Sequence, residues 1–155
     1  MPAAAPPLRA SIPALGFALA GLAVSTYLTI EHYAGSTALA CPESATINCA
    51  KVTTSAWSHL AGVPVAVLGL LYFAAMTLLV APLAWRRRIL DPLRVVGAAA
   101  GMVVVIYLIW AELFRVGAIC LWCTAAHVCT FGLLITILWR IATRPAPATP
   151  RTQPL

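Results

Sequence analysis

Two cysteines with a spacing suited to redox chemistry open the last apolar run of the chain. The stretch CLWCTAAHVC begins with Cys120 and Cys123, a C-x-x-C pair, and continues to His127 and Cys129. A disulfide that closes so small a ring removes little chain entropy and is a poor structural staple. At the N-terminus of a helix the same pair suits exchange, because the helix dipole and free N–H groups stabilise a thiolate. We therefore predict a redox-active dithiol.

Helical geometry separates the other residues of this run. At about 100° per residue, Cys120, Cys123 and His127 fall within an arc of about 60°. Three residues extend this stripe inward: Thr130, Phe131 and Leu134. Cys129 faces elsewhere, and we expect it to be a buried packing residue. His127 is either a satisfied structural histidine or a hydrogen-bond donor to a bound ligand.

The composition indicates a membrane protein. Of the 155 residues 62% are hydrophobic and only 9% are charged, which leaves too little polar surface for a soluble domain of this size. Apolar runs without Asp, Glu, Lys or Arg approach the roughly 20 residues that cross a bilayer; they are 12–30, 63–85, 95–111 and 116–139. Because helices satisfy their own backbone in lipid, we predict an all-α membrane protein, a bundle of four transmembrane helices.

The predicted domain organisation is simple. One membrane domain covers 12–141, and its spans lie at about 12–33, 63–85, 93–113 and 117–140. An extracytoplasmic loop, 34–62, with a short cap helix joins the first two spans. The segments 1–11 and 142–155 are rich in Pro and Ala, and we expect them to be disordered cytoplasmic tails. The first apolar run is too long for the core of a cleaved signal peptide, so we interpret it as a retained span.

The basic residues predict the orientation in a plasma or inner membrane. Eight of the ten lie on one side of a four-span topology: Arg9, Arg86, Arg87, Arg88, Arg94, Arg140, Arg144 and Arg151. The positive-inside rule therefore places both termini in the cytoplasm. These arginines lie at span ends without interleaved aromatic residues, so the net charge of +6 does not indicate nucleic-acid binding.

In this orientation four cysteines share the extracytoplasmic side, where thiol pairs form disulfides. Cys41 and Cys49 lie in the first loop, and Cys120 and Cys123 begin the last span. Four cysteines allow three pairings. The alternatives to a redox role are structural disulfides or a zinc site built from both pairs. We expect no metal, because a bundle whose spans are stabilised by lipid needs no structural ion.

The electrons of a redox-active dithiol need an acceptor. The sequence has no G-x-G-x-x-G and no P-loop for a nucleotide, and no histidine pairs that hold haem across the spans. A lipid-soluble quinone diffuses in the bilayer, and quinone-coupled disulfide formation keeps some extracytoplasmic compartments oxidising. We therefore expect a membrane quinone, either ubiquinone or a menaquinone of the vitamin K type.

The sequence resembles the vitamin K epoxide reductase family in its bacterial thiol-oxidase form. The matching motifs are Cys41-x7-Cys49, KVTTSAWSHLAGVPVAVLGLLYF at 51–73, and Cys120-Leu-Trp-Cys123. The resemblance covers about 12–140. The other four-span quinone-coupled oxidase family carries its C-x-x-C in the first periplasmic loop, where this chain has a C-x7-C.

The resemblance implies a role for each cysteine. Cys41 and Cys49 would form the loop shuttle pair, with Cys41 accessible to a reduced thioredoxin-like partner. Cys49 would pass electrons by exchange to Cys120 through a transient disulfide. Cys123 would be the thiol nearest the quinone, with which it forms an adduct or a charge-transfer complex as a thiolate.

The resemblance also implies a quinone pocket capped by the segment after Cys49, in which 56–62 forms a short interfacial helix. The alternative for this segment is a generic polar lid with Trp57 as an interface anchor. His127 replaces the tyrosine of animal members, and Val65 lies near the place of their pocket asparagine, which favours a plain quinone over vitamin K epoxide. The expected pocket residues are Cys123, His127, Thr54, Ser55, Trp57, Val65 and Phe131.

Together these expectations predict a membrane thiol:quinone oxidoreductase that reoxidises a dithiol protein. Many bacterial relatives carry a fused thioredoxin-like domain where this chain has a Pro-rich tail, so we expect the partner to be a separate protein. The rival hypotheses are a transmembrane conduit for reductant and a non-catalytic membrane protein with structural disulfides. Glu112 and Arg115 are three residues apart, and we expect them to pair at the surface; alternatively Glu31 or Glu112 relays protons.

Overall fold

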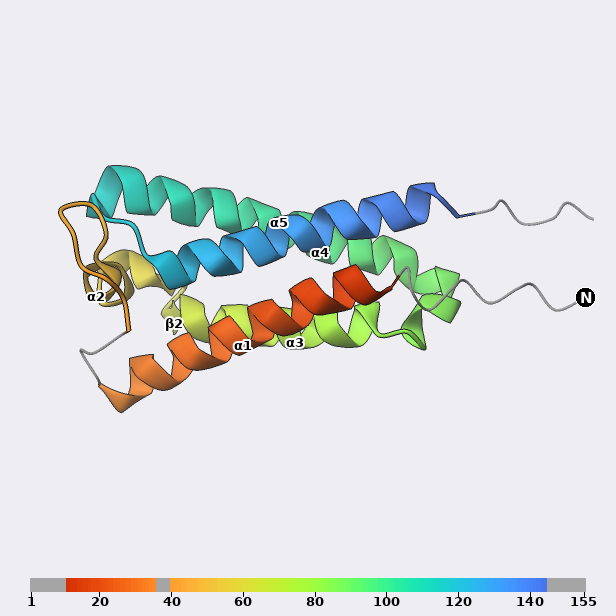
Figure 1. Cartoon of the computed structure of the whole chain (residues 1–155), viewed down its shortest axis with the longest axis horizontal. Coiled ribbons are helices and arrows are strands. Elements are labelled where there is room, and N and C mark those ends of the chain that lie inside the picture. The colour runs from red at the N-terminus through yellow and green to blue at the C-terminus, as the bar shows by residue number, and fades with distance from the viewer. Residues whose placement is uncertain (1–10, 36–39, 145–155) are drawn as a thin grey trace, which may run out of the picture.

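Four apolar helices lie side by side in the computed structural model, which describes residues 11–35 and 40–144 (Figure 1). They are α1 (Ile12–Ala34), α3 (Val65–Val80), α4 (Asp91–Ala111) and α5 (Leu121–Ala142). Within the described ranges, three helical stretches are long and apolar enough to cross a membrane: 12–34, 88–116 and 121–142. Helix α3 is apolar but has only 16 residues. The mainly helical, membrane-type bundle is confirmed.

The predicted disordered tails fall almost entirely outside the described residues. Only Ser11 of the first tail and 142–144 of the second are described, and both lie at the end of the bundle opposite the cysteine-bearing loop (Figure 1). Helix α5 continues to Ala142, two residues beyond the predicted end of the last span at 140.

Helix α1 holds the bundle together through a stripe of small residues. Its buried positions are Ala14, Ala18, Gly21, Ser25 and Leu28. Small side chains four residues apart let neighbouring helix backbones approach closely, which is how helices associate in lipid. The ring of Phe73 from α3 occupies the space beside Gly21, where a Cβ atom would clash with it. As a result α1 packs most extensively against α3 and α5, and α4 packs against α5.

Helix α3 is shorter than the predicted span 63–85 at both ends. It ends at Val80, because Ala81 takes an extended conformation with φ −56° and ψ 145° before Pro82. A residue that precedes proline is disfavoured in the helical region, and proline offers no N–H to continue the helix. Two short 3₁₀ turns then lead into α4: η3 (Ala84–Arg86) and η4 (Arg88–Leu90).

A buried tryptophan ties the α3–α4 connection to α5. The guanidinium carbons of Arg94, Arg140 and Arg144 lie 4.4, 4.3 and 5.0 Å from the centre of the Trp85 ring. Asp91 forms ion pairs with both Arg94 and Arg144. Cation–π contacts strengthen when the groups are removed from water, and only 1% of Trp85 is exposed. The cluster of Trp85, Asp91 and these arginines fixes the end of the bundle away from the loop.

The segment before α3 is a hairpin rather than the predicted interfacial helix over 56–62. After helix α2 (Cys49–Thr53) the chain makes a 3₁₀ turn, η2 (Ala56–Ser58), and then pairs strand β1 (His59–Leu60) with β2 (Val63–Pro64). The turn residues Ala61 and Gly62 both have positive φ, 52° and 81°. This is the geometry that closes two-residue hairpins, and glycine adopts it without strain.

The last helix begins later than the predicted residue 117. Helix α4 passes into a π-helical turn, η5 (Glu112–Val116), which Gly117 ends in the left-handed conformation with φ 63°. Cys120 is the N-cap residue of α5. The C-x-x-C pair therefore lies at a true helix N-terminus, as the sequence predicts, but with an extended approach from 118 to 120.

The Trp85 cluster gives a prediction for stability. Replacing Trp85 by Ala should lower the free energy of unfolding by about 3 kcal/mol, because it leaves a cavity and removes the surface on which the arginines stack. Thermal unfolding in detergent measures this. Trp139→Ala is the matched control, since Trp139 is 58% exposed near the same end of the bundle. Equal losses in both variants would contradict the proposed role of the cluster.

Candidate functional site

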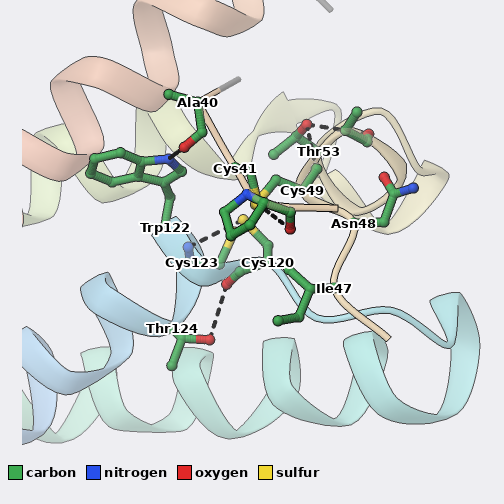
Figure 2. Close-up of a disulfide and its surroundings, with 12 residues drawn as sticks. Ala40, Cys41, Ile47, Asn48, Cys49, Thr53, Cys120, Trp122, Cys123 and Thr124 are labelled. Carbon is green, nitrogen blue, oxygen red and sulfur yellow. Dashed lines mark hydrogen bonds between the residues drawn. A yellow bond between two sulfur atoms is a disulfide. The ribbon is translucent and has the colours of Figure 1, made fainter. Parts of the chain in front are cut away.

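A disulfide joins Cys41 to Cys49 at the loop end of the bundle (Figure 2). Their Cα atoms are 6.2 Å apart and eight positions separate them in the chain. Cys49 is the first residue of α2, which Asn48 caps by accepting a 2.8 Å hydrogen bond from the N–H of Lys51. Cys49 is only 1% exposed, whereas Cys41 is half-buried. Cys41 is thus the more accessible sulfur of the pair.

A short backbone bridge holds the loop against the segment that leads to the C-x-x-C pair. Ile47 and Ile119 form an isolated parallel bridge. The N–H of Asn48 donates to the carbonyl of Ile119 at 3.1 Å, and the N–H of Ile119 donates to the carbonyl of Thr46 at 2.9 Å. Cys120 directly follows Ile119, and Cys49 lies two residues after Ile47, so the bridge places the two cysteines beside each other.

The resulting cluster contains both thiol pairs. Cys49 and Cys120 are buried in one contact cluster with Val52 and Ala118, and Cys41 and Cys123 pack against it. Figure 2 shows the four labelled cysteine side chains gathered at one place between the loop and the start of α5. Contact between the loop disulfide and the dithiol is therefore part of the fold.

Trp122 binds the loop at the residue that precedes Cys41. Its indole N–H donates to the carbonyl of Ala40 at 3.1 Å (Figure 2), and its ring centre lies 4.7 Å from that of Tyr27 on α1. The residue before Cys41 is thereby tied to α5 and, through the aromatic contact, to α1. The variable position Trp122 within the C-x-x-C motif thus positions the loop.

The two thiols of the C-x-x-C pair are free and interact directly. The Sγ atom of Cys120 accepts a 3.2 Å hydrogen bond from the N–H of Cys123. A hydrogen bond from the Cys123 thiol, together with the backbone N–H groups of Trp122 and Cys123, lowers the pKa of the Cys120 thiol, although burial opposes the change. Cys129 is also free and buried, and it packs away from the other thiols, as expected.

A buried carboxyl lies beside the dithiol. Glu112 is 6% exposed, and its side chain interacts with the backbone of Cys120 and with the thiol of Cys123. The predicted surface pair with Arg115 is wrong. Glu112 begins a π-helical turn, which changes the angular relation of residues three apart.

Arg115 instead stacks on two aromatic rings. Its guanidinium carbon lies 4.9 Å from the centre of the Trp57 ring and 5.2 Å from that of Trp110. The rings of Trp57 and Trp110 meet edge to face, with centres 5.8 Å apart. This arrangement binds the segment after the loop disulfide to the end of α4.

A cavity of about 270 Å³ opens beneath this segment, between the helices. All four long helices contribute to its walls, which are mainly apolar. The predicted pocket residues that line it are Cys123, His127, Ser55, Trp57 and Val65. The inner thiol of the dithiol therefore borders an apolar chamber inside the bundle.

Two predicted pocket residues do not line this cavity. Thr54 is exposed and its hydroxyl donates to the carbonyl of Ala50 at 2.8 Å; Thr53 lines the cavity in its place. Phe131 is 57% exposed, and the buried Thr130 faces the cavity. On α5, Thr130 and Phe131 lie on either side of the stripe formed by Cys123 and His127. Their angular positions alone do not decide which of the two faces the cavity.

The cavity also contains polar groups that sequence reasoning did not select. The hydroxyl oxygen of Tyr72 is buried and has no hydrogen-bond partner within the described part of the chain. Glu112 and Thr53 line the cavity as well. Tyr72 could have been selected from the sequence, because it places a polar hydroxyl in an otherwise apolar run. His127 on α5 is buried and lines the cavity as well.

The described residues contain no group of three or more His, Cys, Asp or Glu side chains arranged to hold a metal ion. With Cys41 and Cys49 joined to each other, the four cysteines do not together supply four thiolates.

The fold and the site define a helical membrane oxidoreductase with two adjacent cysteine pairs. The model of the vitamin K epoxide reductase family matches residues 12–138, which is most of the chain. The protein belongs to this family. A search of curated proteins finds no match.

The lowered pKa of Cys120 gives a prediction for its pH dependence. Its alkylation should reach half of its limiting rate at a pH below 9.0, the ordinary pKa of a thiol, because a lower pKa raises the thiolate fraction near neutrality. Peptide mass spectrometry follows Cys120 separately. Cys123→Ala should move this midpoint upward, whereas Cys123→Ser keeps a hydrogen-bond donor and should move it less. A midpoint that does not change in Cys123→Ala would contradict the assigned cause.

Proposed function

We propose that the protein is a membrane thiol:quinone oxidoreductase that reoxidises a thioredoxin-like dithiol protein and reduces a membrane quinone. The observation that carries this proposal is the contact of the loop disulfide with a dithiol whose inner thiol borders an apolar cavity. Electrons would travel from the partner to the Cys41–Cys49 pair, then to the Cys120–Cys123 pair, and then to the quinone. Disulfide bond formation in other proteins is the outcome.

The accessibility of the loop sulfurs supports the first transfer. A partner thiolate attacks the half-buried Cys41, the loop disulfide opens, and Cys49 leaves as a thiolate beside Cys120. The second thiol of the partner attacks the mixed disulfide, which oxidises the partner and releases Cys41 as a thiolate. Cys49 then attacks Cys120 when the inner pair is oxidised, which releases Cys123. Cys41 completes the exchange by closing on Cys49. The inner pair ends as a dithiol, the state seen here.

The cavity supports a quinone as the electron acceptor. Its volume of about 270 Å³ and its apolar walls suit a quinone ring, and pockets for small molecules combine such walls with a few fixed polar groups. The Tyr72 hydroxyl and the His127 ring are hydrogen-bond donors for the quinone oxygens. Ser55 and Trp57 cover the ring from the side of the loop. Both ubiquinone and menaquinone ring types fit this chemistry.

We further propose that α3 is a fourth span. Sixteen helical residues rise about 24 Å, and the hairpin before α3 and the turns after it make up the remaining depth of about 30 Å. The arginines of the Trp85 cluster would face the cytoplasm with both termini. The cysteine pairs would then face the extracytoplasmic side, where an oxidising environment favours disulfides.

The rival hypothesis of a reductant conduit needs thiols that are reachable from both ends of the bundle. The remaining cysteine, Cys129, is buried and lies about 14 Å along α5 from Cys120, in the half of the bundle near the loop. No thiol in the described residues lies near the Trp85 cluster. This arrangement supports electron transfer among cysteines that all lie on one side of the membrane.

Quinone reduction by the purified protein in detergent tests the proposal. The dithiol-reduced protein should reduce soluble ubiquinone or menaquinone analogues, followed by absorbance, and Cys123→Ala should fall to the uncatalysed rate because the attacking thiol is lost. Cys129→Ser is the control and should retain turnover. Failure of the unmodified protein to reduce any quinone, or full turnover by Cys123→Ala, would contradict the proposal.

A further inference from the structure

We propose that Glu112 is the proton acceptor of the inner dithiol: its carboxylate takes the proton of Cys123 and delivers it to an oxygen of the quinone bound in the cavity. The inference rests on the proposed thiol:quinone activity and adds a catalytic residue to it. Glu112 is the carboxyl-bearing residue of the cavity wall, and its side chain interacts with the Cys123 thiol.

The backbone around Glu112 fixes its position. The carbonyl oxygen of Glu112 accepts hydrogen bonds from the N–H groups of Gly117 at 2.9 Å and Ala118 at 3.3 Å. These bonds close the π-helical turn that joins α4 to the approach of the C-x-x-C pair. The carboxyl is thus held at the junction from which Cys120 begins α5, and insertions of this kind into helices are frequent at functional sites.

The carboxyl of Glu112 is buried without a cationic partner in the described residues. An ionisable group within an apolar bundle is costly and is retained where it pairs or functions. The nearest candidate in sequence, Arg115, stacks on Trp57 and Trp110 instead. Arg94 and Arg144 form ion pairs with Asp91, at the other end of the bundle. The contacts of Glu112 are with the redox-active cysteines.

The other titratable groups of the cavity are less well placed. His32 lies on α1, where its ring contacts those of Tyr33 and His59. Tyr72 lies on α3, and His127 lies one turn further along α5 than Cys123. The Cys123 thiol interacts with the side chains of Cys120 and Glu112, and Glu112 lines the same cavity as Cys123. Cys120 is itself a reactant, so Glu112 is the group left to accept the proton.

The step balances with the quinone as the oxidant. Cys123 loses its proton to Glu112, and its thiolate bonds to a carbon of the quinone ring. Glu112 passes this proton to one quinone oxygen and then accepts the proton of Cys120. The Cys120 thiolate attacks the Cys123 sulfur, so that the S–S bond forms and the S–C bond breaks. Two electrons remain on the quinone. Its two oxygens take the two protons of the former thiols, which Glu112 relays in turn and so recovers its starting state.

The test compares Glu112→Gln with Glu43→Gln. Both changes remove one carboxylate, but Glu43 is exposed in the loop. Glu112→Gln should lower quinone turnover at neutral pH by about 100-fold or more, the usual contribution of a general base. The loss should shrink as the pH rises, because hydroxide then removes the thiol proton. Glu43→Gln should match the unmodified protein both in turnover at neutral pH and in the pH profile of turnover.

Glu112→Asp retains a shortened carboxylate and keeps the inference testable if the glutamine variant does not fold. It should turn over more slowly than the unmodified protein while keeping the pH dependence of a carboxylate base. Turnover by Glu112→Gln within twofold of the unmodified protein at every pH would overturn the role of Glu112 and leave the proposed function intact. An unmodified protein that reduces no quinone would overturn both.

Discussion

The parallel bridge between Ile47 and Ile119 is the contact on which the proposed chemistry depends. Its flanking hydrogen bonds join a loop that follows α1 to the approach of α5, and these segments are about seventy residues apart in the chain. Because Cys120 directly follows Ile119 and Cys49 lies two residues after Ile47, the bridge brings the two cysteine pairs into one cluster. The proposed exchange of electrons between the pairs requires this proximity, since thiol–disulfide exchange proceeds by direct attack of sulfur on sulfur.

The two ends of the bundle differ in their contacts and in the regularity of their backbone. At one end Trp85, Asp91 and their arginines form a closed cluster of stacked and paired charges. At the other end the chain departs from regular helix through a hairpin and the π-helical turn that begins at Glu112. Small residues of α1 hold the helices close between these ends. The irregular backbone surrounds a cavity, which is where polar backbone is tolerated within a membrane protein.

The sequence predicted the helical class and the helix N-terminal dithiol because these depend on local patterns, namely apolar run length and cysteine spacing. The early end of α3 was also readable, since Pro82 disfavours helix at the preceding residue. Glu112 was misassigned because its sequence spacing to Arg115 favours an ion pair, whereas Trp57 and Trp110 compete for the arginine through contacts that only the fold creates. Likewise, the angular positions of Thr130 and Phe131 did not show which of them faces the cavity. The packing of α5 decides this, because it buries Thr130 and exposes Phe131.

Trapping a bridge between Cys49 and Cys120 is the most direct test of transfer between the pairs. In a protein that carries Cys41→Ser and Cys123→Ser, these two cysteines have lost their own partners, so mild oxidation should join them rapidly. Mass spectrometry of unreduced peptides identifies the product. The matched variant with Cys49→Ser and Cys123→Ser should bridge Cys41 to Cys120 more slowly, because Cys41 packs at the edge of the cluster. Rapid, selective formation of the Cys49–Cys120 disulfide is the predicted result, and its absence, or equal bridging of Cys41, would contradict the account.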